Sequence, residues 1–133
     1  MAFTYDQYQN LTIREKAYIK SHPHHLMIIK SSKETAFSET KKIFGKNGRN
    51  DKSDAFRHCF WSALLAKEIG YHNALAFTNA HESSPANPHN EKAMDLHNNK
   101  VGLAIGKNKG SKNILSMKCR SALRNGKLKI IRP

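Results

Sequence analysis

The sequence predicts an all-α protein, in which a compact single-domain bundle of six or seven helices surrounds a buried central helix at about residues 53–69. Two observations support this prediction. Apolar residues recur every three or four positions through most of the 133-residue chain, whereas no long stretch alternates between apolar and polar residues as a strand does. Helix-capping residues and glycines stand at the boundaries of these periodic stretches. A chain of this length forms one domain and can bury a core of its own.

Three short helices are expected before the central one. Thr12 and Glu15 form a capping-box pattern, which begins a helix at about residues 13–20. Pro23 suits the first turn of a second short helix. A second capping-box pattern opens the third helix, which ends at Gly45. The two residues of that second pattern are Ser31 and Glu34.

The stretch SDAFRHCFWSALLAKEIG (53–70) forms the predicted central helix. Its first residue, Ser53, is the expected N-cap, and the glycine at its end is the expected stop. Apolar residues lie on both sides of this helix, which is typical of a helix buried in a core. One side also carries Asp54, Arg57 and His58. Because an unpaired buried charge is costly, these side chains need partners, and they indicate a site.

Three further helices are expected after the central one. The first covers about residues 73–82 and leads into a proline-broken loop. Asn87 and Pro88 match the N-cap and the first residue of a long helix. Ser111 is the expected N-cap of the last helix, which runs to about residue 124.

The positive charge of the chain is concentrated in its C-terminal part. The formal net charge is +13, and residues 96–133 contain ten lysines or arginines and no acidic residue. The basic C-terminal segment at about residues 107–133, which ends in an extended tail, is expected to bind a polyanion. DNA or RNA is the first expectation and an anionic lipid the second; an acidic immunity or adaptor protein is a further partner. A solvated basic face without a partner is the alternative.

The sequence also limits where the protein works. No apolar stretch is long enough to span a membrane, and the N-terminus lacks the pattern of a signal peptide. We therefore expect a cytoplasmic protein, or one that is exported without a cleaved leader. Cys59 and Cys119 do not have the spacing of a metal site and are expected to be two buried free thiols.

Ionisable and amide side chains recur on three consecutive helices, within a site-bearing core at about residues 50–106. Helices joined by short turns tend to be neighbours, so these side chains can meet. On the long helix, Asp95 and Asn99 share a face with Gly102, where the missing side chain permits close approach of another helix or of a substrate. His97 lies about 160° around the helix from Asp95. We expect His97, like Asp54, either to be structural or to contact the site residues without binding the metal or the substrate itself.

Imidazole and carboxylate groups are ordinary ligands for zinc, and carboxylates also suit magnesium or manganese. The expected metal ligands are His58, His81, Glu82 and Asp95, and an open coordination position would hold a water molecule as the nucleophile. Arg57 suits a phosphate group, which it can hold with a bidentate fork. The expected catalytic residues are these four ligands and Arg57. The expected substrate-binding residues are Trp61, Asn98, Asn99, Lys100, Arg120 and Arg124.

Two other interpretations use the same residues. Without a metal, His58 or His81 would act as a general base, and Glu82 or Asp95 would orient it. Alternatively, the side chains form a buried ion network that stabilises the fold and has no catalytic role.

Three segments of the chain together resemble a known domain. DAFRHCFWSALLAKEIG (54–70), NAHE (79–82) and MDLHNNKVGLAIG (94–106) resemble an uncharacterised bacterial helical domain that is found in secreted and polymorphic-toxin-like proteins. The resemblance implies a helical fold, a role as an antibacterial effector or toxin, and a site at the polar residues of these segments. Because the activity of that domain is uncharacterised, the resemblance implies no reaction.

From the residues we expect a small, metal-assisted hydrolase that acts on a phosphodiester or a related ester. Nucleic acid is the first-choice substrate, and a phospholipid or lipid-linked phosphate is the alternative. Two non-enzymatic functions stay open: a nucleic-acid-binding module, and a helical module that binds an acidic partner.

Overall fold

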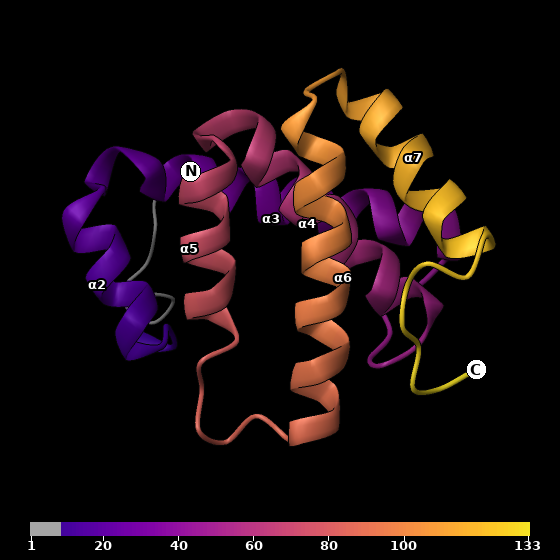
Figure 1. The fold of residues 1–133 in the computed structure, drawn as a ribbon, viewed down its shortest axis with the longest axis horizontal. Coiled ribbons are helices and arrows are strands. Elements are labelled where there is room, and N and C mark those ends of the chain that lie inside the picture. Colours follow the sequence, from indigo (N-terminus) through magenta and orange to yellow (C-terminus); the bar gives the residue numbers. More distant parts are fainter. Residues whose placement is uncertain (1–8) are drawn as a thin grey trace.

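Helix α4 (Lys52–Ile69) lies at the centre of the computed structural model, which describes residues 9–133 (Figure 1). Helices α3, α5, α6 and α7 pack directly against it, and α2 packs on α5. The described residues contain no strand, so the all-α prediction is confirmed for this part of the chain. The other elements are α2 (Ile13–Ser21), the 3-10 helix η1 (Pro23–His25), α3 (Leu26–Phe44), α5 (Tyr71–His81), α6 (His89–Lys107) and α7 (Lys112–Arg124).

Helix α4 is buried along most of its length, as its apolar residues on both sides predict. Its N-cap is Asp51, whose carboxylate accepts a hydrogen bond from the Asp54 amide at 3.0 Å. The prediction of Ser53 as the N-cap is wrong. The Ser53 hydroxyl donates to Asp51 at 2.6 Å and accepts from the Gly48 amide at 2.8 Å. A negative charge is favourable at the positive end of the helix dipole, and this favours the aspartate as the cap.

Three other predicted boundaries differ from the structure. Helix α3 runs without a break from Leu26, because the apolar spacing continues through Ser31 and no glycine or proline interrupts it. Helix α5 begins directly after the glycine that ends α4, two residues earlier than expected. Pro88 is the N-cap of α6 rather than its first residue. The predicted N-caps Thr12 and Ser111 are confirmed.

Two glycines of α6 allow it to lie directly against α4. A Cβ atom added at Gly102 would lie 2.0 Å from the carbonyl oxygen of Cys59, and one added at Gly106 would lie 2.1 Å from that of Ala63. These distances are too short for any side chain, so only glycine fits at both positions. The prediction that Gly102 permits close approach of another helix is confirmed, and the contact brings the polar residues of α6 to those of α4.

The basic tail after α7 is docked along the bundle rather than free. His97 Nε2 donates to the Lys127 carbonyl at 2.8 Å. The Asn98 side chain, fully buried, donates to the Lys129 carbonyl at 2.9 Å and accepts from the Lys129 amide at 2.8 Å. The Asn50 carbonyl accepts from the amides of residues 131 and 132. The tail is therefore hydrogen-bonded both to α6 and to the loop that precedes α4.

Two further sequence predictions are confirmed. Cys59 on α4 and Cys119 on α7 are buried free thiols, with their sulfur atoms 3.0 Å apart. Among residues 9–133, no helix combines the length and the apolar character that a membrane span requires.

Candidate functional site

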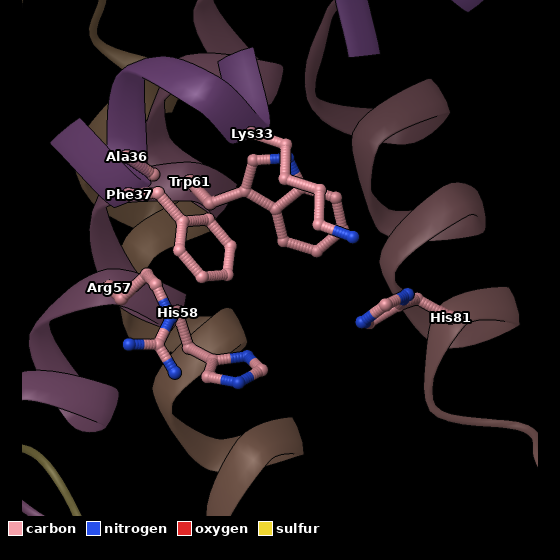
Figure 2. A pocket seen from close by; sticks show the side chains of 7 residues that line it. All are labelled: Lys33, Ala36, Phe37, Arg57, His58, Trp61 and His81. Atoms are coloured by element: carbon pink, nitrogen blue, oxygen red, sulfur yellow. The ribbon is translucent and has the colours of Figure 1, made fainter. Parts of the chain in front are cut away.

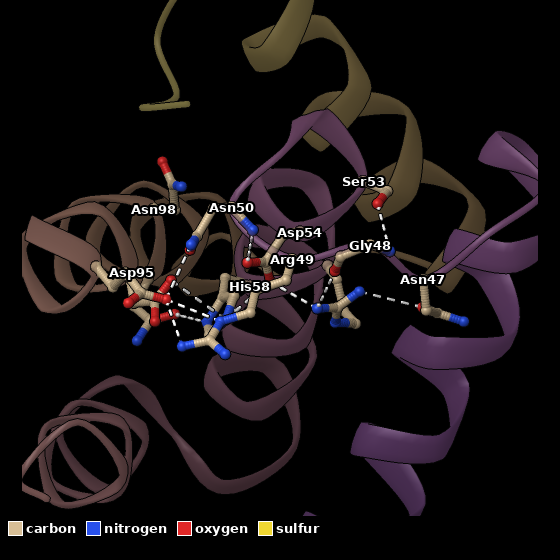
Figure 3. A network of polar contacts seen from close by, with 12 residues as sticks. Asn47, Gly48, Arg49, Asn50, Ser53, Asp54, His58, Asp95 and Asn98 are labelled. Carbon is tan, nitrogen blue, oxygen red and sulfur yellow. Dashed lines mark hydrogen bonds and ion pairs between the residues drawn. The ribbon is translucent and has the colours of Figure 1, made fainter. Parts of the chain in front are cut away.

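The side chain of His58 lies at the centre of a polar cluster between α4 and α6 (Figure 3). Its Nε2 atom lies 3.3 Å from Asp54 Oδ1 and 3.4 Å from Asp95 Oδ1. Its Nδ1 atom lies 3.2 Å from Asn99 Oδ1 and 3.8 Å from Glu82 Oε2. Three carboxylates therefore surround one imidazole ring, and the side chains of His58 and Asp95 are each only 15% exposed.

The hydrogen bonds of Asn99 decide which nitrogen of His58 carries a proton. Its amide nitrogen donates to Glu82 at 3.0 Å, so its oxygen is the atom that faces His58 and accepts from the Ser62 hydroxyl at 3.2 Å. An oxygen only accepts, so His58 Nδ1 must be the donor. In the neutral ring the lone pair is then on Nε2, the atom between Asp54 and Asp95.

Burial and the close approach of three carboxylates together set the pKa values in the cluster. Burial lowers the pKa of His58, but the hydrogen bond with Asp54 and the charges of Asp95, Asp54 and Glu82 outweigh it and raise that pKa above its usual value. Burial raises the pKa of Asp95 to about 6, with help from Glu82 and Asp54 and against the opposing effect of His58. The carboxylates of the cluster outnumber the cations beside them, so part of their negative charge is not neutralised.

Asp54 is held by the loop that precedes α4. Burial raises its pKa, but a hydrogen bond and charge from His58, the Asn50 amide and the charge of Arg57 together lower it. The Asn50 amide donates to Asp54 Oδ2 at 2.6 Å, and Arg57 Nη2 donates to Asp54 Oδ1 at 2.6 Å. Arg57 also donates to the Gly48 carbonyl at 3.0 Å, and its guanidinium lies 4.7 Å from the centre of the Phe37 ring. Asp54 is therefore fixed and ionised.

A second histidine–carboxylate pair lies on the other side of a cavity. His81 Nδ1 lies 2.9 Å from Glu15 Oε2, and Glu15 is only 4% exposed. The other oxygen of Glu15 accepts from the Thr12 amide at 2.9 Å, so the same carboxylate caps α2. Sequence reasoning placed Glu15 only in that capping box and missed its contact with His81, 66 residues away.

A cavity of about 150 Å³ separates the two histidines, and Figure 2 shows the ring of His81 facing His58 across it. Arg57 lies beside His58, and Lys33 of α3 lies above the cavity with Trp61. Two cations and two histidines therefore line one small space. Its lining residues are Lys33, Ala36, Phe37, Arg57, His58, Trp61 and His81.

Three residues in the described part of the chain form a group that could hold a metal ion. One ligand atom each of Asp54, His58 and Asp95 lies within 4.8 Å of the other two. Asp95 Oδ1 is buried and accepts no hydrogen bond from residues 9–133. This group shares His58 and Asp95 with the predicted ligand set and adds Asp54, expected only as a supporting residue. It does not include His81, which pairs with Glu15, or Glu82, which faces the protonated side of the His58 ring.

The three segments that resemble a known domain all lie within the residues that match one protein family. Residues 16–127 match DUF6973, a domain of unknown function. The chain belongs to this family. Neither the curated proteins nor the solved structures contain a match. The family assignment therefore names no reaction, and the function is inferred from the geometry of this DUF6973 domain.

The other predicted site residues of the DUF6973 domain are spread over different surroundings. Asn99 and Trp61 belong to the cluster and the cavity, respectively. Asn98 and His97 turn away from the cluster and bind the tail. Lys100 is exposed on α6. Arg124 is exposed on α7, and Arg120 is partly buried there, with an Nε that has no hydrogen-bond partner in residues 9–133.

Proposed function

We propose that this DUF6973 protein is a small hydrolase that cleaves a phosphodiester or a related ester with the help of a divalent metal ion held by Asp54, His58 and Asp95. The observation that carries the proposal is the convergence of one imidazole nitrogen and two carboxylate oxygens within 4.8 Å of one another. Because Asn99 accepts a hydrogen bond from His58 Nδ1, loss of the Nε2 proton leaves a lone pair that faces both carboxylates, and Nε2 can then bind a metal without a change of tautomer.

The donor set suits a divalent ion. One nitrogen and two carboxylate oxygens match zinc, and the excess of oxygen also suits manganese or magnesium. Such an ion would relieve the crowding of negative charge and bind Asp95 Oδ1, which accepts no hydrogen bond from residues 9–133. Bound there, it would supply Lewis acidity and lower the pKa of a coordinated water towards neutrality.

The cavity offers groups that suit the rest of the reaction. Lys33 and Arg57 can hold the phosphate oxygens. Glu15 binds Nδ1 of His81, so Nε2 is the nitrogen that can give a proton to a leaving group. In the hydrolysis, a water oxygen forms a bond to phosphorus and the bond from phosphorus to the alcohol oxygen breaks. The water loses one proton to a carboxylate, and the alcohol oxygen takes one from His81.

The test measures metal binding and cleavage separately. We expect calorimetric titration with Mn²⁺ or Zn²⁺ to show one site, and Asp95→Asn to weaken it at least about tenfold. Cleavage of bis(p-nitrophenyl) phosphate should stop after chelation and return with metal. His58→Ala should lower its rate by about a hundredfold or more, whereas His72→Ala, an exposed position on α5, should not. Metal-independent cleavage, or no cleavage of any ester with any metal, would contradict the proposal.

A second candidate function follows from the charge of the C-terminal segment. Its nine lysines and arginines favour nucleic acid as substrate, or as the ligand of a non-enzymatic module. The two versions differ in one outcome: the enzyme should cleave the bound nucleic acid and lose this cleavage in His58→Ala and Asp95→Ala, whereas a module should bind without cleavage and bind equally well in both variants. The resemblance to toxin-like proteins adds an antibacterial effector role, for which copurification of an acidic immunity protein would be the supporting observation.

A further inference from the structure

We infer that the substrate is a phospholipid phosphodiester, whose apolar chain lies in a second cavity that continues from the cavity between His58 and His81. The inference rests on the proposed function, because it assigns the substrate class of the same site. It starts from an apolar space that the proposed chemistry at His58 does not use.

The second cavity has a volume of about 220 Å³ and lies among α2, α3, α4 and α5. Its apolar lining consists of Leu11, Ile19, Ile29, Trp61 and Phe77. Trp61, Lys33 and His81 line both cavities, so the two spaces meet at these side chains.

The two cavities differ in their lining, and the second combines its five apolar residues with polar ones that include Asn10 and Lys30. Arg57 and His58 line only the first cavity, and Lys33 stands where the two meet. The acidic residue in the lining of the second cavity, Glu15, is paired with His81. An anionic head group therefore fits the first cavity and an apolar chain fits the second. Burial of each methylene there would be favourable by about 0.8 kcal/mol.

Nucleic acid fits these cavities less well. Binding of a single strand requires exposed aromatic faces for base stacking beside a basic groove. Trp61 and Phe77 are only 6% and 1% exposed. The basic helix α7 packs on α4 and α6, and neither it nor the tail contributes a lining residue to either cavity in the described chain. The charge that favours nucleic acid therefore lies outside the two cavities.

The single tryptophan of the chain provides a direct binding assay, because Trp61 lies between the two cavities. The intact protein is titrated with inorganic phosphate and with n-alkyl phosphates from butyl to decyl, below their micelle concentrations, while Trp61 fluorescence is recorded. We expect the affinity to rise roughly fourfold for each added methylene until the second cavity is full. Equal affinities for all chain lengths, or a response to a dithymidine phosphodiester alone, would overturn the inference.

Three variants test whether the alkyl chain of the ligand binds in the second cavity. Leu11→Glu places a charge in the second cavity and should abolish the dependence on chain length. Met117→Glu makes the same kind of change on the exposed face of α7 and should leave the dependence intact. Lys33→Gln, at an exposed position that does not endanger folding, should weaken binding of every alkyl phosphate by a similar factor. A chain-length dependence that survives in a folded Leu11→Glu variant would place the chain elsewhere and contradict the inference.

Cleavage separates this inference from the proposed function. Vesicles of phosphatidylglycerol and phosphatidylcholine, DNA and RNA are each incubated with the metal-loaded protein, and products are identified by mass spectrometry. Release of the alcohol from phosphatidylglycerol, lost in His58→Ala, supports both. Cleavage of DNA or RNA with intact lipid overturns the inference and leaves the proposed function standing. If no ester is cleaved, the proposed function fails, and the alkyl phosphate titration still decides whether the cavity binds an apolar chain.

Discussion

At the scale of single residues, His58 shows how neighbouring side chains fix the tautomer of an imidazole ring and so determine which nitrogen can bind a metal. Asn99 accepts from Nδ1 while its amide group donates to Glu82, so the ring cannot exchange tautomers without breaking a buried hydrogen bond. Such bonds to the distal nitrogen also orient metal-binding histidines. The orientation of the His58 ring is therefore fixed before any ligand binds.

Glu15 joins two structures that are far apart in the sequence. It completes the capping box of α2 and binds His81 of α5. Burial raises its pKa, but the hydrogen bond and charge of His81 and the hydrogen bonds with Thr12 outweigh this effect and lower the pKa below 4.5. A carboxylate with a lowered pKa in the folded state stabilises the fold only while it is ionised.

We expect the acid sensitivity of the protein to decrease in Glu15→Gln. In the wild type, the stabilisation from ionised Glu15 is complete above pH 4.5 and is lost as the pH falls through the lowered pKa. Urea unfolding from neutral pH down to about pH 3 should therefore show a difference between wild type and variant that shrinks towards acid. Glu68→Gln, at an exposed position on α4, is the control for loss of one charge. A difference that grows towards acid would contradict the assignment.

At the scale of helices, the contact between α4 and α6 sets the distances within the cluster. Asp95 and Asn99 come from α6, whereas Asp54 and His58 come from α4. Gly102 lies on α6 against the backbone of Cys59, the residue after His58. The helix spacing and the geometry of the cluster are therefore coupled.

We expect Gly102→Ala to destabilise the protein and to weaken metal binding together. The new Cβ atom would meet a backbone carbonyl at 2.0 Å, so relief requires α6 to move away from α4. Overpacking of this kind costs about 1–3 kcal/mol or more, which lowers Tm by roughly 10 °C. Thermal unfolding and calorimetry with Mn²⁺ measure the two effects. Ala104→Ser, at an exposed position on the same helix, should change the stability by less than about 0.5 kcal/mol. Wild-type stability in Gly102→Ala would show that the helices are not in direct contact.

At the scale of the whole molecule, charges of opposite sign occupy different regions. Three carboxylates gather around His58 between α4 and α6. The basic residues of α7 and the tail lie outside the two cavities, and Figure 1 shows α7 and the C-terminus on the side of the bundle away from α2 and α5. Polyanion attraction and ester chemistry are thus assigned to different surfaces, and they can be tested independently.

We expect the protein to bind duplex DNA with an affinity that falls steeply as salt concentration rises. Each phosphate contact contributes about −0.9 to the slope of log K against log salt. Arg124→Gln combined with Lys127→Gln removes two exposed cations and should reduce the slope by up to about two. Lys41→Gln combined with Lys42→Gln, at two exposed positions on α3, serves as the matched control. An affinity that does not depend on salt, or that falls in His58→Ala as much as in the double variant, would contradict a separate basic surface.

Much of the fold could be predicted from local pattern. The spacing of apolar residues, the capping box at Thr12 and the cap at Ser111 all depend on neighbours within a few positions, and these predictions are confirmed. The cap of α4 could not be chosen as securely, because Asp51 and Ser53 both suit the position. The choice depends on how Ser53 bonds to Gly48 and Asp51 in the folded loop.

The sequence by itself determined the all-α class, the buried central helix and the three helices that supply polar residues to one region. Periodicity states which residues share a face of a helix. The tertiary structure alone decided which faces meet. It paired Glu15 with His81, placed Asp54 and Asp95 on the same nitrogen of His58, and turned Asn98 towards the tail. The physical reason is that the rotation and axial offset of one helix against another are set by long-range packing, such as Gly102 on Cys59, which no local pattern contains.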